Sequence, residues 1–225
     1  MENDYRKLFD KKKQELMRNF FLDLSQKGSI KDYKRGEIIE FVPKKFCIVV
    51  EGNVQKSFYS NDGGEKILYL LAPGEVFGEI NYFGNGDEVF YVTNIEDSKV
   101  SFLDYEFLDK YLNDNPKAHK YFMHSVVRKY RIIRYQMTNM AFSTATEKLA
   151  DTIFRIYIQD GIEKSGERII GSTLTHQRLA DLIGCSRVTV TNEINQLKAE
   201  GIIESRGKKI IITDLKKLDE KRGKI

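Results

Sequence analysis

The chain has 225 residues, of which 41% are hydrophobic and 31% charged, a composition that excludes disordered and fibrous proteins. Its longest apolar run, Ile67–Ala72, is too short to cross a bilayer, and its N-terminus lacks the basic start and apolar stretch of a signal peptide. We therefore expect a cytoplasmic protein without a membrane partner. The net charge of +4 resides in residues 201–225, where eight Lys/Arg accompany four Asp/Glu, and a basic end suits a polyanionic partner.

The two cysteines, Cys47 and Cys185, cannot supply all the ligands of an all-cysteine zinc site or of a typical iron–sulfur cluster. In a cytosolic protein we expect both thiols to be reduced and buried. A disulfide between them is the alternative that counting alone leaves open.

Residues 4–24 carry apolar side chains at helical spacing among charges, which predicts one or two amphipathic helices. From Ile30 to Leu103 the pattern changes to short β-rich runs separated by glycine-containing turns; the runs are 46–50, 54–59, 66–71, 89–95 and 99–103. Asn61–Gly64 lies between two of them and indicates a hairpin turn. Many short strands at close spacing predict an antiparallel sandwich or barrel.

A long helix is expected to begin at Asp114-Asn-Pro116, with proline in the first turn behind a capping side chain. Apolar residues then recur at steps of three or four, which favours packing against a second copy of the helix. The alternative is a helix that covers the sheet of its own domain. Ser143, Thr144 and Thr146 mark a helix break and hinge, after which helical patterning resumes over 147–159. The predicted dimer seam consists of Phe122, Val126, Tyr130, Ile133, Met137 and Met140.

The strongest signal is a helix-turn-helix over residues 175–197. Thr175 caps its first helix, Ala180 is small where the second helix must approach closely, and Gly184 permits the left-handed backbone that ends a helix. Ser186 caps the second helix. Its outer face is rich in amide, hydroxyl and guanidinium groups, which favours entry into a DNA major groove over burial as an ordinary helical hairpin. Its inner face consists of Val190, Ile194 and Leu197.

After Gly201 we expect two short strands, 202–203 and 210–212, joined by the basic turn Ser205–Lys209. Strand, basic turn and strand after a helix-turn-helix make a wing, whose cations contact the phosphate backbone. The residues expected to contact DNA are Thr175, Ser186, Arg187, Val188, Thr189, Thr191, Asn192, Gln196, Arg206, Lys208 and Lys209.

Five segments carry a family resemblance along nearly the whole chain: Ile48–Val54, Gly63–Ile67, Leu71–Ile80, Met140–Phe142 and Ile183–Arg187. Through them the chain resembles the cyclic-AMP receptor protein and fumarate–nitrate regulator (CRP/FNR) family of bacterial transcription regulators. The resemblance implies an α+β fold with an N-terminal antiparallel β-roll (a cupin-like jelly roll) as sensor domain, a long dimerisation helix with hinge, and a C-terminal winged helix-turn-helix. These parts correspond to residues 1–113, 114–142 and 143–225. It also implies a homodimer on a pseudo-palindromic operator of double-stranded DNA, and contact with RNA polymerase.

One departure concerns the effector. In cyclic-nucleotide-binding members of the family, Phe-Gly-Glu is followed by Arg-Ser or Arg-Thr; the glutamate holds the ribose hydroxyl and the arginine the cyclic phosphate. Gly78 and Glu79 match, but Val89 and Phe90 stand at the Arg-Ser positions, and no arginine occurs from residue 36 to 127. A buried phosphate needs a cationic partner, so we expect no cyclic-AMP binding and interpret Glu79 as structural.

The effector pocket expected at this place is formed by Gly78, Glu79, Tyr82, Phe83, Val89, Phe90 and Tyr91. Its aromatic side chains either surround a small aromatic or apolar effector or simply fill the β-roll. An iron–sulfur cluster would need an N-terminal cysteine set, which is absent, and a haem ligand would have to be His119 or His124, which are expected to be solvent-facing or packed. The effector therefore remains unidentified.

The alternative function is a cyclic-nucleotide-binding regulatory module that acts on a protein partner. The missing arginine and the winged helix both count against it. A catalytic role has no motif to support it, since Gly74–Glu79 lacks the Gly-Lys-Ser/Thr ending of a phosphate-binding loop.

The resemblance also bears on base recognition. In the cyclic-AMP receptor, two arginines and a glutamate of the recognition helix read a half-site resembling TGTGA. Arg187 matches the first arginine, whereas Val188 replaces the glutamate and Asn192 the second arginine. Because an asparagine amide pairs with adenine, we expect the second G·C pair of the half-site to shift towards A·T.

Overall fold

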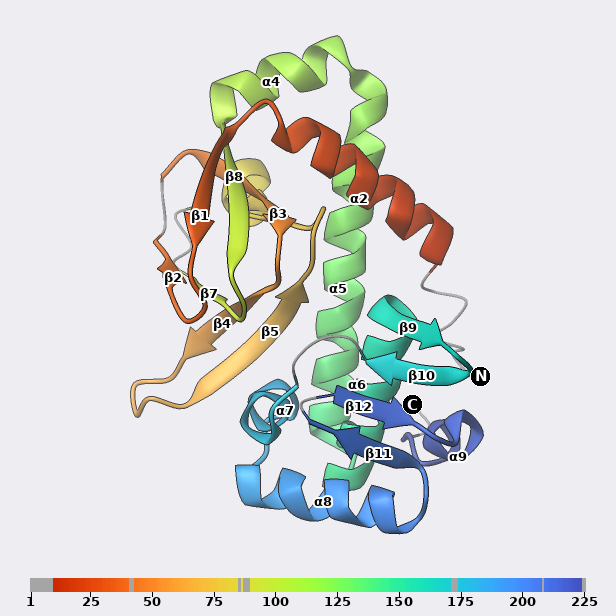
Figure 1. Ribbon diagram of the computed structural model, residues 1–225. Helices are drawn as coiled ribbons and strands as arrows, with labels where there is room; N and C mark the ends of the chain where they lie inside the picture. Colours follow the sequence, from red (N-terminus) through yellow and green to blue (C-terminus); the bar gives the residue numbers. More distant parts are fainter. Residues whose placement is uncertain are drawn as a thin grey trace. The chain divides into compact units, whose positions relative to one another are not determined.

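The computed structural model describes residues 10–40, 43–84, 86, 90–170, 174–207 and 209–223. Residues Lys11–Ile132 form one compact unit, and the described residues from Ile133 onward belong to the other. The boundary falls inside one long helix, α5 (His119–Phe142), which the sequence-based division treats as a segment of its own (Figure 1). No helix of the described residues is long and apolar enough to span a membrane.

The first unit is the expected β-roll, built from two antiparallel four-stranded sheets. One sheet has the order β1 (Ser29–Tyr33), β8 (Ser98–Asp104), β3 (Lys45–Glu51), β6 (Val76–Phe77). The other has the order β2 (Ile38–Ile39), β7 (Tyr91–Asn94), β4 (Val54–Tyr59), β5 (Glu65–Leu71). The hairpin turn predicted at Asn61–Gly64 is confirmed: it joins β4 to β5, and Gly63 takes the left-handed φ of 84° that the turn needs.

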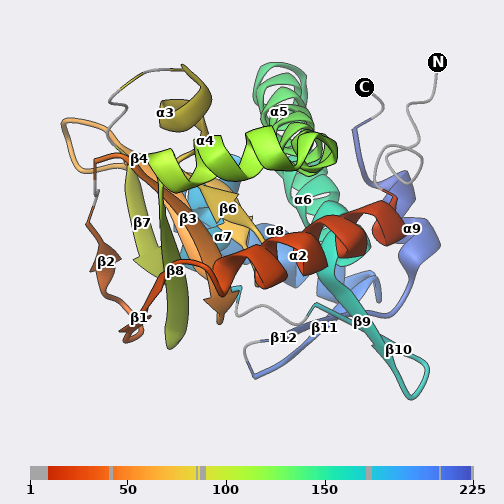
Figure 2. The same cartoon turned by 90° about the horizontal axis from the view of Figure 1, so that it is seen from above.

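Helices of this unit cover the first sheet on one side (Figure 2). The predicted N-terminal helix is α2 (Lys11–Ser25), whose Met17, Phe21 and Leu24 are buried against strand residues such as Phe46. Helix α4 (Tyr105–Asp114) adds Leu108 and Leu112 to the same core. A further short helix, α3 (Glu79–Gly84), follows β6.

The start of the long helix differs from the prediction in two details. Asp114 ends α4, and Pro116 opens a 3-10 turn, Pro116–Ala118, that leads into α5. Asn115 makes no side-chain cap for that turn; its Nδ2 donates instead to the Tyr111 carbonyl 2.9 Å away. Phe122, predicted in the dimer seam, lies in the β-roll core, because the face of α5 that carries it packs on the sheet.

The second unit is the expected winged helix-turn-helix, preceded by α6 (Ala145–Asp160). The predicted helix break is confirmed: α5 ends at Phe142, and Thr144 caps α6 in a capping box with Glu147. A four-stranded sheet follows, in the order β11 (Ile203–Arg206), β12 (Lys209–Ile212), β10 (Glu167–Ile170), β9 (Gly161–Lys164), and α9 (Leu215–Glu220) ends the described fold.

Both cysteines are free, and burial raises the pKa of the Cys47 thiol, which makes it unreactive. Cys185 is only half-buried, so the expectation that both thiols are buried is wrong for this residue. It lies directly after Gly184, in the turn between two helices.

Candidate DNA-binding interface and sensor site

The helix-turn-helix consists of α7 (His176–Ile183) and α8 (Arg187–Ala199). The Thr175 hydroxyl caps α7 by accepting the Arg178 N–H at 3.1 Å, and Gly184 ends it with a left-handed φ of 68°. The Ser186 hydroxyl caps α8 by accepting the Thr189 N–H at 3.0 Å. The local structure between the two helices is therefore determined by the side chains that the sequence singled out.

The inner faces of these two helices pack as predicted. Leu179, Ala180 and Ile183 of α7 are buried, and so are Val190, Ile194 and Leu197 of α8. Burial of one face fixes which side of α8 is left for DNA.

The outer face of α8 presents three side chains in the best position to contact bases. Arg187, Val188 and Asn192 are exposed, Val188 to 70%. Within the described part of the chain, Arg187 and Asn192 make no side-chain hydrogen bond or ion pair, so their donors and acceptors are available. The arrangement offers a guanidinium, a methyl surface and an amide to the edges of base pairs.

The other predicted contacts on this surface are already engaged within the protein. Thr189 shares a hydrogen bond with the Ser186 hydroxyl (2.8 Å), and Thr191 Oγ1 donates to the Arg187 carbonyl (2.9 Å). The Gln196 amide donates to Glu200 at 3.0 Å but stays exposed. These side chains fix local backbone and reach DNA only through their remaining polar atoms.

Two contacts that hold the recognition helix were not predicted from the sequence. His176 Nδ1 lies 2.9 Å from Thr191 Oγ1, and Thr146 on α6 donates to Glu193 Oε2 at 2.5 Å. Burial lowers the pKa of His176, and the nearby Lys198 and Arg187 cations lower it further, so the neutral ring is favoured. A histidine opening a helix gives no sequence signal of the residue it will face in the next helix.

The wing is the antiparallel pair β11 and β12, whose strands are longer than predicted. Three residues of the expected basic turn belong to the strands instead: Ser205 and Arg206 end β11, and Lys209 opens β12. Arg206 pairs with Glu167 of β10 at 2.7 Å and with Glu204 at 3.2 Å, whereas Lys209 is exposed. Lys208 lies outside the described residues.

In the β-roll, the glutamate that matches the family's ribose ligand is occupied by the protein itself. Gly78 has a φ of 89°, and Glu79 behind it is buried at the start of α3. Glu79 Oε1 lies 2.8 Å from Lys129 Nζ on α5, and the same ammonium donates to the Val76 carbonyl at 2.6 Å. The second carboxylate oxygen, Oε2, has no hydrogen-bond partner among the described residues.

A second buried lysine lies beside this pair. Lys56 of β4 is 1% exposed, and its ammonium stands 3.9 Å from the centroid of the Phe90 ring. Its cross-strand partner on β5 is Tyr69, whose ring is 5.6 Å from the Lys129 ammonium. Each of the two buried lysines therefore lies near an aromatic ring of this unit, Lys56 over Phe90 and Lys129 near Tyr69.

The other aromatic residues predicted for the pocket lie elsewhere. The Tyr82 hydroxyl donates to Asp109 of α4 at 2.6 Å, and its ring packs 4.7 Å from that of Phe83, which is 48% exposed. Tyr91 points outward and packs on Tyr59. Of the aromatic residues predicted to line the pocket, Phe90 is the one whose ring lies against Lys56. Val89 lies outside the described residues.

The exposed face of α5 carries an apolar row. Val126, Tyr130, Met137 and Met140 are exposed and Ile133 is half-buried, as a seam requires. Met123, exposed to 63%, takes the place predicted for Phe122.

The described residues contain no group of three or more His, Cys, Asp or Glu side chains able to hold a metal ion.

Comparisons with known proteins agree with this architecture. Residues 30–115 match the profile of a cyclic nucleotide-binding domain, and residues 147–221 match a Crp-like helix-turn-helix domain. The chain is 24% identical over 190 residues to the CRP-like cAMP-activated global transcriptional regulator of Mycobacterium tuberculosis, covering 83% of this chain and 85% of that protein. It is 28% identical over 170 residues to the cAMP-activated global transcriptional regulator CRP of Haemophilus influenzae, covering 73% of each chain.

A solved structure extends the likeness to the fold. The c-di-GMP responsive global regulator CLP of Xanthomonas campestris gives a TM-score of 0.72 at 18% identity, covering 86% of this chain and 98% of that chain. The two matched profiles lie in the β-roll and in the winged helix-turn-helix, where the sequence placed a sensor and a DNA-binding domain. The chain therefore belongs to the CRP/FNR family of transcription regulators, which are not enzymes.

Proposed function

We propose that this protein is a dimeric, sequence-specific transcription regulator that acts without cyclic AMP, either with another effector or with none. The observation that carries the proposal is the outer face of α8, where Arg187, Val188 and Asn192 are exposed on a pair of helices that are both capped by side chains. A regulator of this kind works where the DNA is, in the cytoplasm, and acts through RNA polymerase.

The dimer is supported by the spacing of the exposed apolar residues of α5. Met123, Tyr130 and Met137 are seven residues apart, and so are Val126, Ile133 and Met140. The two series together form the a and d positions of a heptad repeat, which packs helices side by side as a coiled coil. A single chain leaves this row in water, and a second copy covers it with the same residues.

Independence from cyclic AMP is supported by the ion pair of Glu79. In relatives that bind the nucleotide, the matching glutamate holds a ribose hydroxyl, as the resemblance implies. Here Lys129 pairs with the carboxylate, and Phe90, one of the two residues at the Arg-Ser positions, has its ring against the Lys56 ammonium. A nucleotide would have to break a buried ion pair before it could bind, which is costly.

The Mycobacterium tuberculosis and Haemophilus influenzae relatives are both described as cAMP-activated, and this favours the competing candidate of a cAMP-responsive regulator. The regulator CLP of the same fold is described as responsive to c-di-GMP, so one fold serves several signals. The ion pair of Glu79 with Lys129 supports the proposal of a signal other than cyclic AMP.

Selection from random DNA duplexes at fixed salt tests the proposed function. We expect a pseudo-palindrome whose half-site keeps the guanine read by Arg187 and carries A·T where the TGTGA half-site has its second G·C pair. Asn192→Ala should cost about 1–3 kcal/mol on that site and relax the preference at that base pair alone. The matched control is Asn195→Ala, one turn further along the exposed face.

The proposal fails if unchanged TGTGA half-sites are recovered, or if Asn192→Ala alters affinity for all sequences equally. In either case α8 docks on the DNA in another way.

A further inference from the structure

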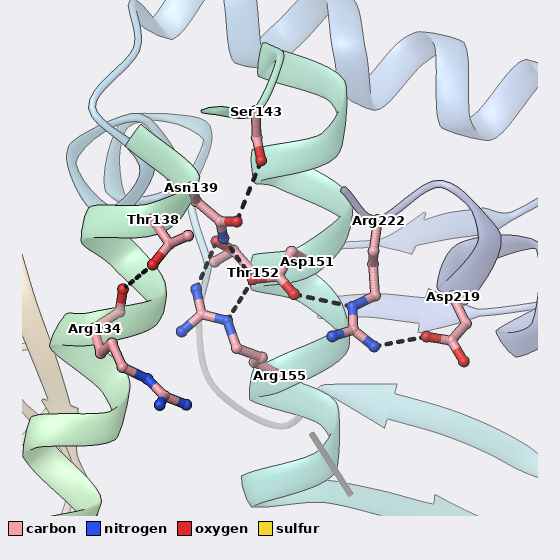
Figure 3. A network of polar contacts seen from close by, with 9 residues as sticks. All are labelled: Arg134, Thr138, Asn139, Ser143, Asp151, Thr152, Arg155, Asp219 and Arg222. Atoms are coloured by element: carbon pink, nitrogen blue, oxygen red, sulfur yellow. Dashed lines mark hydrogen bonds and ion pairs between the residues drawn. The ribbon is translucent and has the colours of Figure 1, made fainter. Parts of the chain in front are cut away.

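A buried carboxylate on α6 connects three separate parts of the DNA-binding unit. Asp151 Oδ2 accepts a hydrogen bond from Asn139 Nδ2 of α5 at 2.6 Å and one from Arg155 Nε of α6 at 2.7 Å. Its other oxygen, Oδ1, accepts from Arg222 Nε at 2.9 Å. Figure 3 shows the three donors converging on this one side chain.

The carboxylate and two of its three donors are buried, and the third, Arg222, is half-buried. Asp151 is 3% exposed, and both Asn139 and Arg155 are buried as well. Burial by itself would raise the pKa of Asp151, but Arg155 and Arg222 outweigh it and hold the pKa below its ordinary value, so the carboxylate stays charged. A charged, fully bonded acceptor fixes its donors in direction more strictly than apolar packing does.

Asn139 makes the contact that crosses the junction between α5 and α6. The two helices are separated only by Ser143 and Thr144. The Asn139 amide accepts from the Ser143 hydroxyl at 3.3 Å through Oδ1 and donates to Asp151 through Nδ2. An amide is suited to this position because it presents an acceptor and a donor at once.

Arg222 brings in the segment that follows α9. Its Nη1 pairs with Asp219 at 2.6 Å, and its guanidinium lies 4.1 Å from the centroid of the Phe154 ring on α6. The end of the described chain is therefore attached to the same face of α6 that carries Asp151.

We propose that Asp151 is a positioning residue for DNA recognition: its bond to Asn139 fixes the angle between the end of α5 and α6, and its bond to Arg222 holds the segment after α9 on α6. The proposal rests on the proposed dimer: if two copies join along α5, this angle sets the separation of the two recognition helices. Half-sites of helix-turn-helix dimers lie about one turn of DNA apart, roughly 34–36 Å, so a small angular change alters which half-site spacing fits.

The test compares operators whose half-sites are at the selected spacing or one base pair further apart. In Asn139→Asp two carboxylates face each other across the junction; in Asn139→Ala the crossing hydrogen bond is simply lost. Both variants should reduce the preference for the selected spacing by at least about fivefold, the lower end of typical coupling between sites. Affinity for a single isolated half-site and its base preference should stay unchanged, because α8 is not altered.

Thr138→Ala is the matched control. Among the described residues, its hydroxyl donates to the Arg134 carbonyl within α5 alone, at 2.7 Å, so the spacing preference of this variant should equal that of the wild type. A folded, dimeric Asn139→Asp or Asn139→Ala protein with the wild-type spacing preference overturns the inference alone. A wild-type protein that sediments as a monomer overturns the proposed dimer together with it.

Discussion

At the level of single residues, buried ionisable side chains join segments that are distant in the sequence. Glu75, after β5, lies 2.8 Å from Arg18 of α2 and 2.9 Å from Arg128 of α5. The pair of Glu79 and Lys129 joins α3 to α5 in the same unit. Removing one partner of such a pair leaves a buried charge, which typically costs about 3–5 kcal/mol.

These residues were not recognisable from the sequence. Lysine is among the residues least often fully buried, so Lys56 and Lys129 gave no signal of a structural role. Lys99, another lysine of the same unit, lies at the surface and pairs with Glu51. The relevant cations became visible only through partners such as Glu79, which lies fifty residues before Lys129.

The buried carboxylates predict how stability depends on pH. Burial would raise the pKa of Glu75, but Arg128 and Arg18 hold it below its ordinary value, and the pKa of Asp151 is lowered in a similar way. Each group therefore contributes stability that is fully present above its unfolded pKa of about 4 and is lost as pH falls through the lower folded value.

Urea unfolding from pH 7 down to pH 2 measures this contribution. We expect the free energy of unfolding to fall below about pH 4, and Glu75→Gln to lessen that fall in the β-roll unit. The control is Asp104→Asn, which removes an exposed pair with Lys45 and should leave the curve almost unchanged. A free energy independent of pH over this range would contradict the assigned charge state.

At the level of elements, the sequence predicted the helices and strands whose apolar residues are regularly spaced. It missed the strands that form only through pairing with distant parts of the chain. The long strands, α5, α6 and the helix-turn-helix follow from apolar spacing and capping residues. Strands β2 and β6 are two residues long, too short to show an alternating pattern. Strands β9 and β10 carry charged residues, and β10 is stabilised by pairing with β12, some forty residues later.

The seam of α5 shows how far such a prediction reaches. Spacing at steps of three or four fits both Phe122 and Met123, because Phe122 lies four residues and Met123 three residues before Val126. Only the structure shows that Phe122 faces the core while Met123 is exposed. With Met123 in place of Phe122, the steps between seam residues alternate between three and four, as a heptad repeat requires.

Charge in this seam should separate the proposed dimer. Met137→Glu places two carboxylates opposite each other in the apolar interface of a dimer. Burying these two charges should cost about 3–5 kcal/mol of dimer stability. Sedimentation should find monomers with weak operator binding, while the thermal unfolding of the β-roll stays as in the wild type because Met137 is 66% exposed in one chain. Met137→Leu keeps an apolar a position and should remain a dimer. Wild-type sedimentation for Met137→Glu would exclude this face of α5 as the interface.

At the level of the whole molecule, regulation requires that a signal in one unit changes the DNA affinity of the other. Such coupling is reciprocal and usually amounts to about 1–3 kcal/mol, a factor of roughly five to 150. Within the β-roll unit, the ion pair of Lys129 and Glu79 joins α5 to the start of α3. Under the proposed function, this pair holds α5 on the β-roll without a nucleotide.

We expect cyclic AMP to leave DNA binding by this protein unchanged. Operator affinity should be the same, within about twofold, with and without cyclic AMP, well below the fivefold expected of even weak coupling. Calorimetry should detect no binding at micromolar concentrations, because no arginine from residue 36 to 127 is available for the phosphate and Glu79 is paired. Lys129→Met, which fits the space but removes the cation, should lower operator affinity without making the protein responsive to cyclic AMP. Micromolar binding to the wild type, or a gain of response in Lys129→Met, would show that the nucleotide site is intact and that the ion pair merely covers it.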